Sequence, residues 1–305
     1  MYDIIIIGGG PAGITCGIYA VRSGLKTLLL EKEIVGVQVI NTYEIKNFPT
    51  YKNISGSDFC SLLYSQAEYN NLEIKSEEVL SVDLKSKIKT IKTLNISYEA
   101  KTVVLCVGAK PRNLNLENEQ NLIGKGISYC ALCDGNFFRN KSVAVIGGGD
   151  SSMEDAIYLS GICSKVYVIS RSKEFKAQEI LQKSLIMHKN EKQNIEIIYN
   201  AEFAKINGAN FLTDIDIIKK DENKTENIKI DGMFLAIGRT PDTQLFKNEL
   251  ELTKSGYIIV DNKMQTNVQG VFAGGDCIDK TIRQILTACS DGAMCATFAN
   301  QYIKE

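Results

Sequence analysis

The stretch that decides the fold is Asp3-Ile4-Ile5-Ile6-Ile7, followed at once by Gly8-Gly9-Gly10-Pro11-Ala12-Gly13. The apolar run predicts a buried strand, and a helix is expected from about Ala12 to Ser23, ended by Gly24. Thr27 to Glu31 is the next predicted strand. A strand, a G-x-G-x-x-G turn, a helix and a second strand that ends in an acid are typical of a dinucleotide-binding β-α-β unit.

Each residue of this motif has a separate physical task. Gly8 makes the tight turn, Gly10 lets the backbone approach a pyrophosphate, and Gly13 lets the helix pack on the strand. The helix N-terminus supplies amide donors and partial positive charge to the phosphates. Glu31 is placed to accept hydrogen bonds from ribose hydroxyls. We therefore predict a first dinucleotide site here.

The same pattern occurs a second time. Ser142 to Ile146 leads into Gly147-Gly148-Gly149-Asp150-Ser151-Ser152, then a helix to about Ser160 and a strand from Val166 to Ile169. Laid over the first copy, Glu31 falls on Ser170. An internal duplication predicts an α/β fold with two Rossmann-like, doubly wound domains of three layers each.

The second copy differs from the first in charge. The ribose acid is replaced by Ser170-Arg171-Ser172, with Lys176 nearby. An acid would repel a 2′-phosphate, whereas Arg171 and Lys176 could pair with one. The first copy therefore favours a cofactor with free ribose hydroxyls and the second favours NADPH over NADH. A solvated loop is the alternative reading of the two cations.

The other segments indicate how the two units are connected. Strands are expected as hairpins between Ile74 and Ile96, then at 103–109, 195–199, 214–219, 228–237 and 271–273, with a C-terminal helix from about Arg283. Gly108 and Gly238 each end a strand and are followed by an expected crossing between domains. The predicted domains are residues 1–112 and 242–305 for the first and 113–241, inserted into it, for the second.

A pair of cysteines lies just before the second copy, in Cys130-Ala131-Leu132-Cys133-Asp134-Gly135. Two cysteines at this spacing can form and open a small disulfide, and Asp134 is the nearest plausible proton acceptor for a thiol. Half of a zinc site is disfavoured because no second pair of ligands stands at a suitable spacing. The other seven of the nine cysteines are expected to be inert core residues.

Composition excludes several classes of function. The 305 residues have a net charge of -1, which gives no electrostatic case for binding nucleic acid or an anionic membrane. No apolar run is long enough for a membrane span, so a soluble, cytosolic protein is expected. With His188 as the single histidine, catalytic sites based on histidine are disfavoured, and no metal site is expected.

These motifs, in this order and spacing, resemble the bacterial-type, low-molecular-weight thioredoxin reductases over essentially the whole chain. Members of that family are flavoproteins that pass electrons from NADPH through FAD to a Cys-x-x-Cys pair and on to thioredoxin. Besides the glycine motifs and the cysteine pair, the resemblance rests on Asn47-Phe48-Pro49, Gly238-Arg239-Thr240-Pro241, Gly274-Gly275-Asp276 and Arg283-Gln284.

The resemblance implies roles for individual residues. Cys133 matches the sulfur nearest the flavin, Cys130 the thiol that exchanges with the substrate, and Asp134 the acid–base group. The positions implied for FAD are Gly8, Gly10, Pro11, Ala12, Gly13, Glu31, Gln38, Asn47, Gly108, Gly275, Asp276, Arg283 and Gln284. The positions implied for NADPH are Gly147, Gly149, Asp150, Ser151, Ser152, Arg171, Lys176, Gly238 and Arg239.

The electron donor is the part of this assignment with open alternatives. The family's 2′-phosphate motif is His-Arg-Arg-x-x-x-Arg, and the corresponding run here is Ser170-Arg171-Ser172-Lys173-Glu174-Phe175-Lys176. NADPH is expected, with NADH, reduced ferredoxin or O₂ as alternatives on the same scaffold, and a non-catalytic flavin-binding protein as a remote one. The resemblance also implies a homodimer and hinges near Arg112 and Arg239.

Overall fold

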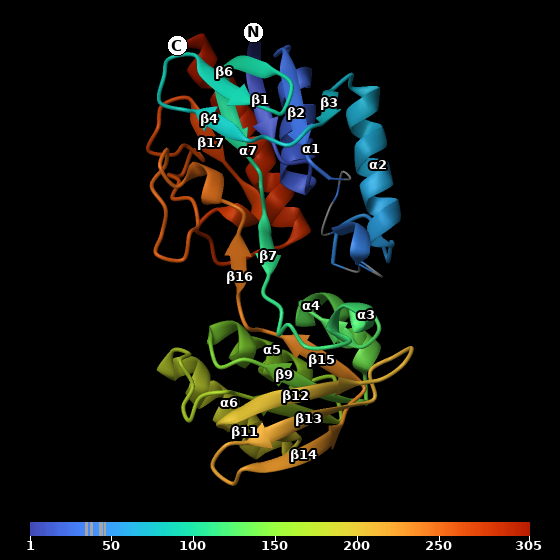
Figure 1. Cartoon of the computed structure of the whole chain (residues 1–305). Coiled ribbons are helices and arrows are strands. Elements are labelled where there is room, and N and C mark those ends of the chain that lie inside the picture. The colour runs from blue at the N-terminus through green and yellow to red at the C-terminus, as the bar shows by residue number, and fades with distance from the viewer. Residues whose placement is uncertain (34–35, 37–38, 43–44, 46) are drawn as a thin grey trace. The chain divides into compact units, whose positions relative to one another are not determined.

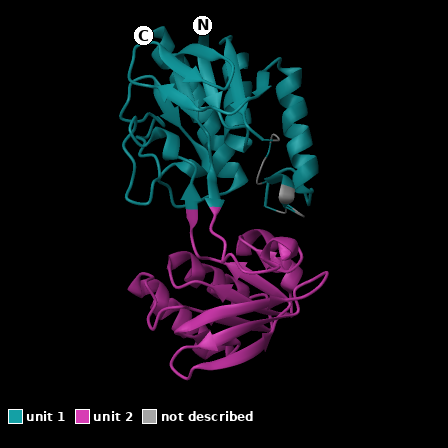
Figure 2. Cartoon of the chain, viewed as in Figure 1, with its two compact units in different colours: residues 1–110, 240–305 teal, residues 111–239 magenta. Residues whose placement is uncertain are grey.

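The computed structural model describes residues 1–33, 36, 39–42, 45 and 47–305. The chain divides into two compact units, residues 1–110 with 240–305 (unit 1) and residues 111–239 (unit 2) (Figure 2). The chain passes between them in β7 (Ala109–Pro111) and β16 (Arg239–Pro241), which pair with each other. In the part of the chain so described, no helix is long and apolar enough to cross a membrane.

Unit 1 is built on a mixed sheet of order β3-β2-β1-β6-β5-β4, with β17 also paired to β6 (Figure 1). Its strands are β1 (Tyr2–Ile7), β2 (Thr27–Glu31), β3 (Glu73–Ser76), β4 (Ser81–Asp83), β5 (Lys89–Lys92), β6 (Ser97–Leu105) and β17 (Val271–Ala273). Its helices are α1 (Pro11–Arg22), α2 (Gly56–Tyr69) and α7 (Ile285–Lys304), with short 3-10 turns η1 (Val39–Asn41), η3 (Gln244–Phe246) and η4 (Gly275–Cys277).

The first strand shows how this sheet is buried. Successive side chains of a strand point to opposite faces. Ile4 and Ile6 pack in the cluster that contains residues of α1 and α7, whereas Ile5 and Ile7 pack on the other face. All four isoleucines are at most 6% exposed. Burial on both faces explains why β1 is a continuous apolar run, as parallel strands usually are.

Unit 2 has a parallel sheet of order β11-β10-β9-β15-β8, and a small antiparallel sheet of order β12-β13-β14. The strands are β8 (Ile127–Ser128), β9 (Ser142–Ile146), β10 (Lys165–Ile169), β11 (Ile195–Ile198), β12 (Ala201–Asn207), β13 (Asp214–Lys219), β14 (Lys224–Lys229) and β15 (Gly232–Leu235). The helices are α3 (Glu119–Leu122), α4 (Ala131–Asp134), α5 (Asp150–Ser160) and α6 (Glu179–Lys192), with a 3-10 turn η2 (Gly135–Phe138). Helices α5 and α6 cover one face of the parallel sheet and the small sheet covers the other.

The duplication extends to the strand register. Ile7 pairs with Leu30 in unit 1, and Ile146 pairs with Ile169 in unit 2. The glycine after each first strand donates to the same position: Gly8 N to Leu30 O at 2.9 Å, and Gly147 N to Ile169 O at 3.0 Å. The predicted α/β fold with two Rossmann-like domains is confirmed.

Two strand predictions are wrong in detail, and strand β12 was missed. Residues 74–96 do not form hairpins throughout, because β3 pairs in parallel with β2 and only β4 and β5 continue antiparallel into β6. The single strand expected at 228–237 is two strands, β14 and β15, in different sheets. Strand β12 was not expected. Alternation of apolar and polar residues indicates a strand but not its partner.

Candidate functional site

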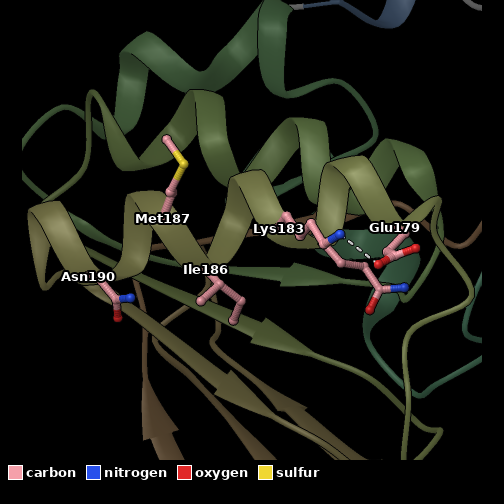
Figure 3. A pocket seen from close by; sticks show the side chains of 6 residues that line it. Glu179, Lys183, Ile186, Met187 and Asn190 are labelled. Carbon is pink, nitrogen blue, oxygen red and sulfur yellow. Dashed lines mark ion pairs between the residues drawn. The ribbon is translucent and has the colours of Figure 1, made fainter.

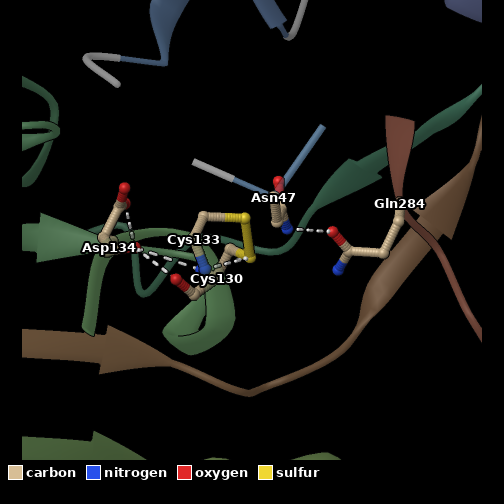
Figure 4. Close-up of a disulfide and its surroundings, with 6 residues drawn as sticks. Asn47, Cys130, Cys133, Asp134 and Gln284 are labelled. Carbon is tan, nitrogen blue, oxygen red and sulfur yellow. Dashed lines mark hydrogen bonds between the residues drawn. A yellow bond between two sulfur atoms is a disulfide. The ribbon is translucent and has the colours of Figure 1, made fainter. Parts of the chain in front are cut away.

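Cys130 and Cys133 form a disulfide with their Cα atoms 5.3 Å apart (Figure 4). Cys130 caps the N-terminus of α4, and its Sγ accepts a hydrogen bond from Cys133 N at 3.2 Å. Both cysteines are half-buried. Between them Ala131 is buried and Leu132 is 53% exposed. An amide donor at Cys130 Sγ stabilises a thiolate when the bond opens, which favours thiol–disulfide exchange.

Asp134 follows the disulfide on the same short helix and is connected to Ser128. The Ser128 hydroxyl donates to Asp134 Oδ2 at 2.6 Å, and Cys130 N donates to the hydroxyl oxygen at 3.1 Å. Burial raises the pKa of Asp134, and the hydrogen bond from Ser128 opposes that rise. No sequence motif singled out Ser128, because its role depends on β8 ending beside α4.

The glycines of the first turn differ in the space that a Cβ atom would find at each of them. A Cβ on Gly8 would lie 2.3 Å from Cys106 O, and one on Gly13 would lie 1.8 Å from Gly8 O. These two glycines are therefore required by packing. A Cβ on Gly10 would meet nothing within 4 Å, although Gly10 is the N-cap of α1 and Pro11 begins the helix. The open position at a helix N-terminus fits a phosphate group.

Glu31 is buried at the end of β2, where its carboxylate accepts backbone amides. Gly9 N donates to Oε2 at 2.5 Å, and Glu33 N donates to Oε1 at 2.9 Å. The side chain is 7% exposed. Glu31 therefore holds the glycine turn in place, a structural task additional to the ribose contact expected from the sequence.

The turn after β17 carries two further positions expected at FAD, Gly275 and Asp276. Gly275 has φ +82°, and a Cβ there would lie 3.0 Å from Cβ of Ala12. Gly275 N donates to Asp291 at 2.9 Å, and Asp291 forms an ion pair with Lys280 at 2.6 Å. This mostly buried pair ties η4, with Asp276, to the middle of α7.

The residues at the start of α7 contact both the turn and the loop before α2. Gln284 caps α7, and its Oε1 accepts from Asn47 Nδ2 at 2.9 Å. The Arg283 guanidinium lies 4.2 Å from the ring centre of Tyr257 and donates to Ile278 O at 3.2 Å. Gln38, also expected at FAD, lies outside the described residues.

The second glycine turn repeats the arrangement of the first. A Cβ on Gly147 would lie 2.4 Å from Ala236 O, whereas one on Gly149 would meet nothing within 4 Å. Ser152 is fully buried at the position of Gly13, and its hydroxyl donates to Gly149 O at 2.6 Å. Asp150 begins α5 and accepts two hydrogen bonds from Gln178.

The cationic side chains expected to bind a 2′-phosphate lie beside this second turn. Arg171 and Lys176 are exposed, and within the described residues neither forms an ion pair. Lys173, by contrast, pairs with Asp221 at 3.3 Å. Lys176 N donates to Gly148 O at 2.7 Å, which fixes this residue next to the glycine turn. Two free cations at the end of β10 fit an anionic group.

The remaining positions are placed by backbone geometry. Ser151 is exposed in the first turn of α5. Gly108 and Gly238 have φ +67° and +98°, and they end the segments that lead into β7 and β16. Gly108 O accepts from Asp242 N at 3.2 Å, and Gly238 O accepts from Arg112 N at 3.0 Å. Arg239 begins β16.

Comparison with known proteins assigns the chain to a family. Residues 2–292 match the family model described as pyridine nucleotide-disulphide oxidoreductase. The chain belongs to this family.

Individual relatives narrow the assignment within it. The chain is 40% identical to a 34.2 kDa protein in the rubredoxin operon of Clostridium pasteurianum, covering 99% of this chain and 97% of the relative. It is 37% identical to a thioredoxin reductase of Peptoclostridium acidaminophilum, covering 100% and 98%. Thioredoxin reductase from Streptococcus pyogenes is a similar solved structure, with TM-score 0.92, 36% identity and coverage of 100% and 98%. The chain is a disulphide oxidoreductase of the thioredoxin reductase type and, like this family, a flavoprotein.

Burial separates the disulfide-bonded pair from four of the other cysteines. Cys16, Cys106, Cys277 and Cys295 are buried in unit 1, and burial raises the pKa of each thiol, that of Cys277 to about 12. A thiol with so high a pKa is a poor nucleophile.

His188, on α6, contacts Ser184 O through Nδ1 at 2.8 Å.

A shallow hollow lies along α6, with a volume of about 470 Å³ (Figure 3). Its lining is Glu179, Gln182, Lys183, Ile186, Met187 and Asn190. Glu179 and Lys183 pair across one helical turn at 2.7 Å. None of the residues expected to bind a cofactor or act in catalysis lines it.

Proposed function

We propose that the protein is an NADPH-dependent, FAD-containing reductase that transfers electrons to the disulfide of thioredoxin or a thioredoxin-like protein. The observation that supports this most strongly is the Cys130–Cys133 disulfide, half-exposed, capped by an amide and followed by Asp134, on the same chain as two dinucleotide cradles. The full-length similarity to thioredoxin reductases supports the substrate class.

In this proposal unit 1 holds FAD. The open position at Gly10 and the N-terminus of α1 would receive the pyrophosphate, while Glu31 keeps the turn in shape and lies at the ribose position. Asn47, Asp276, Arg283 and Gln284 belong to the flavin end of the site by their family positions. Bound FAD supplies two-electron chemistry, accepting a hydride equivalent from NADPH and giving two electrons to a disulfide.

Unit 2 would bind NADPH at Gly149 and the N-terminus of α5. The absence of a carboxylate at Ser170 removes the repulsion that an acid would exert on a 2′-phosphate. Arg171 and Lys176 carry positive charges that no neighbouring carboxylate neutralises among the described residues. These charges support NADPH over NADH, although a lysine lacks the two-pronged hydrogen bonding of an arginine.

The dithiol step follows from the cysteine chemistry. Reduction of the Cys130–Cys133 bond gives two thiols. The Cys130 thiolate attacks the partner's disulfide, forming a mixed disulfide and releasing one partner thiolate. The Cys133 thiolate then attacks Cys130 Sγ, which restores the internal disulfide and frees the reduced partner. Asp134 exchanges protons with the thiols, since a thiolate and not a thiol is the nucleophile.

The same residues cannot serve every partner in one arrangement. Cys133 has to receive electrons from the flavin, Cys130 has to reach a protein substrate, and NADPH on the same unit has to approach the flavin. We therefore infer that β7 and β16, where the chain passes between units, act as hinges. A homodimer is part of the proposal by family likeness, and sedimentation of the holoenzyme tests it.

Anaerobic reduction of the flavin tests the proposal. Purified holoenzyme is mixed with NADPH, NADH or reduced ferredoxin while flavin absorbance is followed. NADPH should bleach the flavin fastest, and Cys130→Ser should retain this bleaching but lose reduction of thioredoxin. Failure of millimolar NADPH to bleach the flavin would overturn the donor assignment, and loss of both reactions in Cys130→Ser would overturn the order of the relay.

A further inference from the structure

Ser128 lies where three polar groups of the disulfide loop meet. It is the last residue of β8, and the parallel pairing of β8 with β15 sets it opposite Phe234. The residue is 6% exposed. The sheet therefore fixes the position of the Ser128 hydroxyl, whereas α4, with Cys133 and Asp134, is a single short turn.

The hydroxyl has one proton to give, and the distances decide where it goes. Asp134 Oδ2 lies 2.6 Å from Ser128 Oγ, and Cys130 O lies 3.4 Å away. The carboxylate is the closer and the charged acceptor, so it receives the proton. At the same time Ser128 Oγ accepts from Cys130 N at 3.1 Å. One oxygen atom thus ties the carboxylate to the backbone of the first cysteine.

We propose that Ser128 is a positioning residue for disulfide exchange, which holds the ionised carboxylate of Asp134 in a fixed relation to Cys130. The inference deepens the proposed function and rests on the acid–base role given there to Asp134. Ser128 acts on the sulfurs indirectly, through its hydrogen bonds with Asp134 and with Cys130 N.

The charge balance around Asp134 supports this role. Burial raises the pKa of Asp134, and the Ser128 hydrogen bond is the influence that lowers it. The titratable groups on the elements packed against α4 and next to it are Tyr129, Arg139, Asp150, Glu154, Asp155 and Tyr158. None of them contributes to the pKa of Asp134. Arg139 donates to Asn136 and Tyr129 to Asn113.

The first test is a titration of Asp134 itself. Full-length, FAD-loaded protein is labelled with ¹³C at aspartate Cγ, and the Asp134 resonance is identified as the one lost in Asp134→Asn. A hydrogen bond to a charged group contributes enough to change an ionisation constant about tenfold. Ser128→Ala should therefore lower the acid dissociation constant of Asp134 about tenfold, and Ser128→Thr, which keeps the hydroxyl, should restore it.

The second test is the pH dependence of disulfide reduction. In the wild type, one limb of the plot of disulfide-reductase activity against pH should depend on Asp134 and disappear in Asp134→Asn. In Ser128→Ala this limb should move to higher pH, and kcat should fall by a larger factor than KM. Ser160→Ala is the matched control, because Ser160 is 4% exposed and its hydroxyl donates only to Ile157 O at 2.7 Å. This control should leave the limb in place.

An unchanged Asp134 titration in Ser128→Ala would overturn the inference, as would an activity loss that is uniform with pH and that Ser128→Thr does not reverse. The carboxyl titration needs neither an electron donor nor a protein substrate. An enzyme that fails with every donor would thus contradict the proposed function while the titration still decides the role of Ser128.

Discussion

Glu31 and Ser170 occupy the same place in the two nucleotide units and accept the same backbone hydrogen bond. Glu33 N donates to Glu31 at 2.9 Å, and Ser172 N donates to Ser170 Oγ at 3.2 Å. Glu31 is the last residue of β2 and Ser170 directly follows β10, and each faces the middle glycine of its turn, Gly9 or Gly148. The serine keeps the backbone contact of the acid but carries no charge.

This relationship predicts the donor preference of a variant. Ser170→Glu introduces a carboxylate that Gly148 and Ser172 amides can hold, and its charge should repel a 2′-phosphate. We expect KM for NADPH to rise at least about tenfold while KM for NADH stays within about threefold. Steady-state kinetics with both nucleotides measure this. Equal losses with both nucleotides would contradict the assignment.

Arg171 should favour NADPH over NADH by attracting the 2′-phosphate. Arg171→Ala should raise KM for NADPH by about tenfold and leave NADH almost unchanged, because an arginine–phosphate pair is a charge-assisted contact. Lys173→Ala is the control, since Lys173 already pairs with Asp221. A loss as large in Lys173→Ala would mean that general positive charge, and not the Arg171 position, attracts the nucleotide.

Alanine substitutions at the two open glycines should each weaken the binding of one cofactor and not of the other. Gly10 and Gly149 have φ of -76° and -101°, which alanine adopts, and open space where a Cβ would stand. Gly10→Ala should fold but lose FAD, whereas Gly149→Ala should keep FAD and bind NADPH at least about tenfold more weakly. Flavin content and nucleotide titration measure the two effects. Gly13→Ala, by contrast, should unfold unit 1, because its Cβ would overlap Gly8 O.

The half-buried acid Asp155 predicts a pH dependence of stability. Burial, with a smaller effect of Glu154, raises its pKa to about 7, above the ordinary value of 3.8. The raised pKa does not lower the free energy of unfolding at a pH below the pKa that Asp155 has in the unfolded state. It lowers this free energy progressively as the pH rises toward 7. Asp155→Asn should therefore stabilise the protein at pH 8, by up to about 4 kcal/mol, and not at pH 4. Calorimetry across this range, with Glu154→Gln as control, measures it; equal gains at both pH values would contradict the prediction.

The β-α-β units were predictable because their signals are local. Ile4 to Gly13 specifies strand, turn and helix within a few neighbouring residues, and the second copy repeats it. Strand β3 was misassigned because its parallel partner, β2, is distant in sequence and alternation does not identify it. Ser128 escaped prediction for a similar reason, since its contact with Asp134 requires both β8 pairing and the turn of α4.

Reductive titration tests the central claim that Cys130 and Cys133 form a redox pair in electronic contact with the flavin. Under anaerobic conditions, oxidised wild-type enzyme is titrated with NADPH while the flavin absorbance is recorded and the free thiols are counted. Two electrons go to the flavin and two to the disulfide, so about two equivalents of NADPH should be consumed per flavin, with two new thiols. Cys133→Ser should consume about one. Complete bleaching of the wild type by one equivalent, with no new thiols, would contradict the account.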